Sequence, residues 1–297
     1  MIGQKWVQGP GATRSLPMRR PGTMPMDNIR HLARQRFRQE FESLQRHRAF
    51  AHPLFREMKW LAERGRMTSA QFELFRASML ARIFLTIPSI AEHAKQAALA
   101  GDYEMFATVL RNLCEEGANG DVSKMHPRLA EEAFNAVAHD VFDLPGTTMK
   151  AAHDERLPLC RPLQHYKRTV ARLYQDAPTF ASLAQEAASG GDGRTGMMSD
   201  LHALFMAFRP AMAPERFREQ VVPYFQDHLA LDDDGAPIGD AASGVECEHG
   251  RRALADAVGR IGTEDDVRRA LRAMNSFARV QGRYFDAMLG ALRSRAT

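Results

Sequence analysis

The spacing of apolar residues is the feature that most constrains how this chain can fold. Apolar side chains recur every three to four residues along nearly the whole sequence, which is the period of an amphipathic helix. We find no sustained two-residue alternation and no Asn-Gly hairpin between β-branched runs. The sequence therefore predicts an all-α protein, a single-domain helical bundle of about nine helices joined by short loops.

Capping residues and breaks set the expected helix boundaries. A Ser69 cap opens a long helix toward Leu99 with a kink at Pro88, and Thr263 opens the last helix with a capping box. A loop is expected over 232–244. The other helices are expected at 28–47, 102–117, 126–142, 162–174, 178–188, 197–208, 213–231 and 245–261. Residues 1–27 read as a disordered lead-in, or as an over-long start before Met24 or Met26, which leaves 28–297 as the domain.

Composition excludes several classes of protein. The net charge is +4, from 40 basic and 36 acidic residues that are interleaved, so no nucleic-acid partner is expected. No apolar run approaches the length of a membrane span, and the N-terminus lacks a secretory signal. Three widely spaced cysteines suit a reducing cytoplasm. We expect a cytoplasmic protein with a small-molecule partner, whose basic first helix is a solvated face or a homodimer contact.

Several ionisable residues fall on apolar helix faces. His126 shares a face with Leu129, Phe134 and Val137, and Glu116 shares one with Val109 and Leu113. A single inward histidine is usually a hydrogen-bonded core residue, but a buried carboxylate is costly without a cation. Few Arg or Lys lie on these faces, so divalent metal ions would neutralise them. The candidate ligands are Glu116, His126, Glu186, His228, Asp232, Glu246 and His249, whereas Glu115 is expected to turn away.

The motifs around these residues resemble those of one family. The pattern lacks the repeated Glu-x-x-His of ferritin-like bundles. Instead, E-G-A-N-G-D-V-S-K-M-H-P-R-L at 116–129 resembles a signature of the haem-oxygenase-like di-iron oxidases and oxygenases. Ala181 to Glu186, Y-F-x-x-H-x-x-x-D at Tyr224 to Asp232, and E-H-G at 248–250 continue the likeness, which runs from about Phe84 to Val258.

This resemblance implies a haem-oxygenase-like fold that holds two iron ions and uses dioxygen. Carried over, Glu116 and His126 are ligands from one helix region and Glu186 is the bridging or second-site carboxylate. His228, Asp232 and His249 match the remaining set. The chain departs from the family by an insert between Asp232 and His249, which leaves Asp232 or Glu246 as the carboxylate ligand; the intact run to Asp232 favours Asp232.

Glu92 decides which reaction the resemblance implies. The N-oxygenating branch of the family carries an extra carboxylate near this position. The resemblance therefore adds Glu92 to the expected metal ligands and makes Glu92, Glu116 and Glu186 the expected catalytic residues; alternatively Glu92 is an exposed acid beside Lys95. The leading hypothesis is a di-iron N-oxygenase that oxidises an amine or guanidine-type nitrogen of a small metabolite. Such an enzyme would receive electrons from an external donor. One alternative is an oxidase of the same fold that cleaves or desaturates an amino acid or fatty acid. The other is a metal-free helical binding protein.

Overall fold

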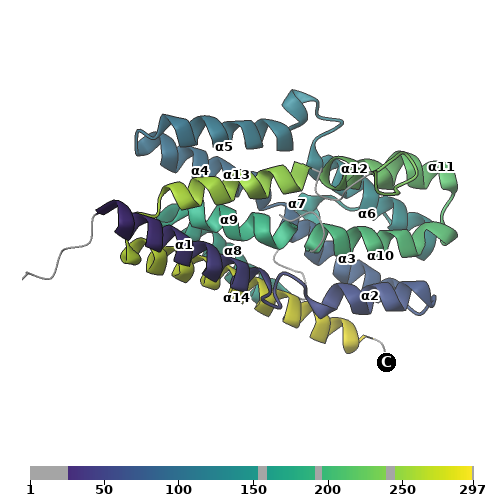
Figure 1. Cartoon of the computed structure of the whole chain (residues 1–297). Helices are drawn as coiled ribbons and strands as arrows, with labels where there is room; N and C mark the ends of the chain where they lie inside the picture. Colours follow the sequence, from purple (N-terminus) through teal and green to yellow (C-terminus); the bar gives the residue numbers. More distant parts are fainter. Residues whose placement is uncertain (1–25, 153–158, 191–195, 239–244, 296–297) are drawn as a thin grey trace, which may run out of the picture.

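The computed structural model is an all-α bundle (Figure 1). It describes residues 26–152, 159–190, 196–238 and 245–295, without the side chains of Cys160, Asp227, Val245 and Glu246. Within these ranges the only strand-like pairing is one bridge between Leu231 and Pro237. The expected lead-in lies outside them, apart from its last residues. The longer helices are α1 (Met26–Gln45), α2 (Pro53–Glu63), α3 (Ser69–Ile83), α4 (Thr86–Leu99), α5 (Tyr103–Glu116), α6 (His126–Phe142), α8 (Cys160–Asp176), α9 (Pro178–Ser189), α10 (Met197–Phe208), α12 (Val222–Leu229), α13 (Val245–Gly259) and α14 (Glu264–Arg293).

Short elements complete the chain. They are α7 (Met149–Ala152), α11 (Pro214–Arg216), the 3-10 turns Ala118–Gly120 and Arg209–Ala211, and a π-helical turn, Phe217–Val221, that leads directly into α12. The predicted 213–231 helix is therefore interrupted, and it stops early because Ala230 adopts a left-handed conformation with φ 50°. A π-helical turn adds a residue to one turn of helix and so changes which side chains face inward beyond it.

Two predicted boundaries on the α3–α4 segment were wrong. Thr68, not Ser69, is the N-cap of α3, because its side chain accepts from the Gln71 amide in a capping box. The break between α3 and α4 falls at Phe84 and Leu85, ahead of Pro88, so Pro88 lies within the first turn of α4, where proline is tolerated. By contrast α6 and the Thr263 capping box of α14 form where the sequence predicts them.

The helices bury one large apolar core with a smaller one beside it. The larger core extends through α1 to α3 and α6 to α14 and includes Phe37, Phe134 and Phe277, all fully buried. The smaller cluster belongs to the α4–α5 hairpin and contains Ile90, Ala94, Ala97, Met105 and Val109. The stretch Ser69–Leu99 is long and apolar enough to cross a membrane by length and composition alone, and 67% of its most apolar window is buried inside the protein.

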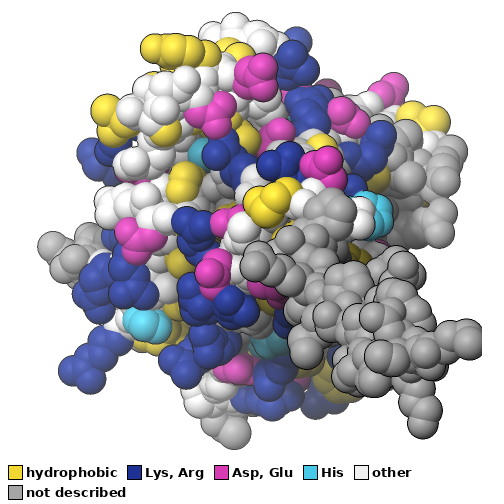
Figure 2. Space-filling model, turned by 60° about the vertical axis from the view of Figure 1, so that its left-hand side comes forward, with side chains coloured by type: hydrophobic (Ala, Val, Ile, Leu, Met, Phe, Trp, Pro, Cys, Tyr) yellow, Lys and Arg dark blue, Asp and Glu magenta, His cyan; other side chains and the backbone are white. Residues whose placement is uncertain are grey.

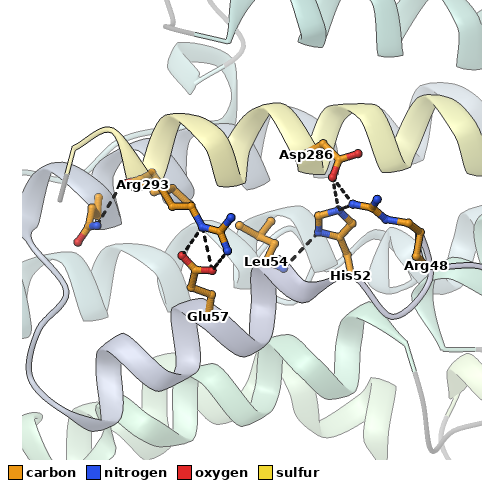
Figure 3. Close-up of polar contacts among 8 residues, drawn as sticks. Arg48, His52, Leu54, Glu57, Asp286 and Arg293 are labelled. Atoms are coloured by element: carbon orange, nitrogen blue, oxygen red, sulfur yellow. Dashed lines mark hydrogen bonds and ion pairs between the residues drawn. The ribbon is translucent and has the colours of Figure 1, made fainter.

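Polar contacts tie α2 to the long α14 (Figure 3). His52 is the N-cap of α2: its Nδ1 accepts from the Leu54 amide at 3.2 Å, so Nε2 carries the proton and donates to Asp286 at 3.2 Å. Burial lowers the pKa of His52 despite the nearby Asp286. Two turns further along α14, Arg293 donates to both carboxylate oxygens of Glu57. These contacts hold α2 against α14.

Candidate metal centre

Four predicted ligands line one cavity of about 50 Å³. Glu116 is the last residue of α5, His126 the first of α6, Glu186 lies in α9 and His228 in α12. All four are buried, as their apolar neighbours predict. Because four separate helices supply them, the packing of the bundle, not one local motif, brings these carboxylates and imidazoles together.

The segment between α5 and α6 turns the chain so that Glu116 and His126 meet. Ala118, Asn119 and Gly120 all have positive φ, and glycine suits the value of 95° at Gly120. Gly117 serves another need, because a Cβ there would lie 3.2 Å from the Leu113 carbonyl oxygen. The predicted role of the glycines, to pass the chain from one helix to the next, agrees with this geometry.

The contact between Glu116 and His126 is close but is not a hydrogen bond. His126 Nδ1 lies 3.2 Å from Glu116 Oε2, yet it has no partner at hydrogen-bond geometry among the described groups. The His126 and His228 rings lie beside each other, with centroids 4.4 Å apart. A buried imidazole nitrogen without a hydrogen bond is costly, and a bound metal ion would satisfy it.

A buried arginine also lines this cavity. Arg82, near the end of α3, is 5% exposed and donates from its NH2 group to Gln281 Oε1 at 2.8 Å. The expectation that few cations lie on the inward faces therefore missed a residue. Arg82 is flanked by Ala81 and Ile83 on a helix that is buried nearly all round. The spacing of apolar residues in this helix therefore does not indicate which side Arg82 faces. Among the described residues that line the cavity, Arg82 is the one arginine or lysine beside the carboxylates of Glu116 and Glu186.

Glu92 does not reach the cavity. It lies on α4, where it accepts from Lys95 Nζ at 2.6 Å and Gln96 Nε2 at 2.7 Å. The hydrogen bond from Lys95 is the main reason that the pKa of Glu92 lies below its usual value. Its side chain borders a separate hollow of about 160 Å³ between α4 and α8. Glu92 is half-buried and pairs with Lys95, the neighbour that the alternative named.

The structure does not bring Asp232 and His249 to the cavity either. Asp232 follows the end of α12, and its Oδ1 accepts from the Asp234 and Ala236 amides at 3.0 and 2.8 Å, so it builds a turn. His249 is buried on α13 with Nε2 2.7 Å from Glu115 Oε2. Glu115 turns away from the cavity, as expected. The side chain of Glu246 lies outside the described residues.

The donor set fits a divalent metal ion by its chemistry. Carboxylate oxygens and imidazole nitrogens together suit iron, manganese or zinc. Among the described His, Cys, Asp and Glu side chains, no three are grouped closely enough to hold an ion as they stand. Binding would therefore require side-chain rotations that bring Glu186 and His228 toward the Glu116–His126 pair.

Comparisons of the chain with protein-family models, characterised proteins and solved structures return no match. The relationship to haem-oxygenase-like proteins stays a prediction from the motifs.

Proposed function

We propose that this protein is an O2-dependent non-haem di-iron oxygenase or oxidase that acts on a small metabolite, with a haem-oxygenase-like fold. One observation carries the proposal: Glu116, His126, Glu186 and His228 converge from four helices on one buried cavity. A metal-free protein would keep the Nδ1 atom of His126 buried without a hydrogen bond among the described groups, which is costly.

The residues that line this cavity have different roles in the proposed function. His126 and His228 would hold the ions through imidazole nitrogens, and Glu116 and Glu186 would hold them through carboxylate oxygens. Bound iron would supply the activation of dioxygen. Arg82, held by Gln281, offsets part of the carboxylate charge. Ile83, Met197, Met198 and Tyr224 form walls that limit the entry of water.

The position of Glu92 bears on the type of reaction. N-oxygenation was the leading hypothesis because the resembling branch has an extra carboxylate near this position. Glu92 instead bonds with Lys95 and Gln96 and borders the separate hollow. This observation favours the second candidate, an oxidase that cleaves or desaturates an amino acid or fatty acid, over an N-oxygenase of an amine.

An anaerobic titration with Fe(II) tests the proposal. We expect close to two iron ions per chain, and substantial loss of binding in Glu116→Ala, Glu186→Ala and His228→Ala. The matched control is Glu115→Ala, which removes the adjacent carboxylate on the same helix and should keep the iron. If the wild-type chain binds no iron, both enzyme hypotheses fail and the metal-free binding protein becomes the better description.

A further inference from the structure

Two rows of basic side chains run along α8 and α14. Arg161, His165, Arg168 and Arg172 follow one another at steps of four, three and four residues, which places them on one helix face. On α14 the positions 272, 276, 279 and 283 repeat these steps, and three of them are arginine. All four α8 side chains and the three α14 arginines are exposed.

The two rows lie next to each other. Tyr166 of α8 contacts Phe277 and Tyr284 of α14, with ring centroids 6.4 and 5.4 Å apart. The end of α8 and the start of α14 border one hollow, so the helices are antiparallel neighbours. Each row is about 17 Å long at the helical rise of about 1.5 Å per residue. We call these seven residues, Arg161, His165, Arg168, Arg172, Arg272, Arg279 and Arg283, the basic face.

The charge of the basic face is not paired with acidic side chains within the described part of the chain. None of its six arginines forms an ion pair with another described residue, whereas Arg268 and Arg269 at the start of α14 pair with Asp265 and Asp266. In Figure 2, Lys and Arg side chains are most frequent in the lower left of the view, with a few Asp and Glu side chains among them. A net charge of only +4 hides this asymmetry, and such a patch attracts an anionic partner.

The composition of the basic face narrows the class of partner. Membrane binding uses exposed apolar side chains, and single-stranded nucleic acid uses exposed aromatic ones. None of the large exposed hydrophobic residues of the described chain lies on α8 or α14 themselves, although Met26 and Leu32 are exposed on the neighbouring α1. The basic face therefore offers charge over a small area, which is typical of weak, rapidly formed complexes between proteins, including electron-transfer pairs.

A continuous buried path joins the basic face to the candidate metal centre. Tyr166 lies on the inner side of α8, beneath the arginines, and stacks on Tyr284. Burial raises the pKa of Tyr166, and the Arg82 guanidinium beside it opposes that rise. Arg82 in turn bonds with Gln281 of α14 and lines the cavity. Packed and hydrogen-bonded groups carry tunnelling electrons better than gaps do, so this path suits electron entry.

We propose that the basic face docks an acidic electron-donor protein, which would reduce the iron site through the α8–α14 side of the bundle. The role assigned to this docking, delivery of electrons, rests on the proposed function. The docking itself does not require metal. In each encounter the donor would lose one electron and bound iron would gain it, with no bond made or broken. Steering by opposite charges raises the association rate and makes the complex sensitive to salt.

Calorimetric titration with an acidic [2Fe–2S] ferredoxin as the probe tests this docking in metal-free protein at low salt. The variant Arg168→Glu/Arg279→Glu reverses one charge in each row. The control Arg111→Glu/Lys150→Glu reverses two exposed charges on α5 and α7 and has the same net charge. Surface pairs contribute about 0.2–1 kcal/mol each, and reversal turns attraction into repulsion. We therefore expect Kd to rise about tenfold in the first variant and to change less than about twofold in the control.

Several results would overturn the docking proposal: no binding by the wild-type chain, equal losses in both variants, or tighter binding of duplex DNA or phosphatidylserine vesicles through the same arginines. Circular dichroism verifies that each variant is folded. Fe(II) titration of Arg168→Glu/Arg279→Glu separates the two proposals, because iron binding should equal that of wild type. If ferredoxin docks on the basic face but iron never binds, the proposed function fails while the docking surface stands.

Discussion

Replacing Glu116 by Gln should remove the thermal stabilisation that Fe(II) gives. A ligand that binds only the folded state at about 100 times its Kd adds about 2.7 kcal/mol of stability. The described part of the chain has about 250 residues, and unfolding entropy is about 2.1 cal/mol/K per residue, so this gain raises Tm by about 5 °C. Glutamine keeps the size of the side chain but loses the charge, and the shift should fall below about 1 °C.

Without metal, Glu116→Gln should change Tm little. The substitution removes the close contact with His126 at 3.2 Å but also relieves repulsion with Glu186 across the same cavity. Each effect is worth about 1 kcal/mol, with opposite sign. Differential scanning fluorimetry under anaerobic conditions, with and without Fe(II), measures both quantities. A full 5 °C shift retained in Glu116→Gln, or lost equally in Glu115→Gln, would refute the assignment of the cavity as the iron site.

Three further changes probe neighbouring features. Glu92→Gln should leave the iron stoichiometry unchanged in the Fe(II) titration, since Glu92 bonds with Lys95 outside the cavity; a lost iron would restore Glu92 as a ligand. Burial lowers the pKa of His93 to about 4, so the unfolded chain binds the extra proton between pH 4 and 6.5 and stability falls as the pH drops through that window. In that window the free energy of unfolding, measured with urea, should change by up to about 1.4 kcal/mol per pH unit. His93→Leu should reduce this pH dependence, and an unchanged pH dependence would exclude His93 as its source. Gln281→Leu should cost about 2–3 kcal/mol in urea unfolding, because Arg82 and the Ala49 carbonyl each lose a buried hydrogen bond; a cost under 1 kcal/mol would contradict this.

The helices were predictable where local chemistry alone decides them. α6 begins at His126 because Pro127 fits its first turn, and the Thr263 box opens α14. The cap of α3 was misplaced by one residue because Thr68 and Ser69 are both good caps, and only the reciprocal bond with Gln71 distinguishes them. The all-α class followed from periodicity, which long amphipathic helices display most clearly.

The candidate site was predictable only in part. Periodicity alone places Glu116, His126, Glu186 and His228 inward, and packing then gathers them. Asp232 was expected one turn beyond His228, but the helix ends at Leu229, and Asp232 bonds with amides of the turn that follows. Arg82 was missed for the opposite reason, since a helix buried all round has no apolar face against which a charged residue stands out.

The cavity draws one wall from a part of the molecule with its own apolar cluster. Glu116 ends α5, whose inner side chains pack with Ile90, Ala94 and Ala97 of α4 and not with the larger core. Small, separately packed units open more readily than the centre of a domain. Opening of the α4–α5 hairpin would break its packing on α8 and α9 and the Glu115–His249 pair, but would leave the larger core intact. The amides of the hairpin should exchange with solvent faster than those of α9, and metal loading should slow them, which would make this hairpin the gate through which ions enter.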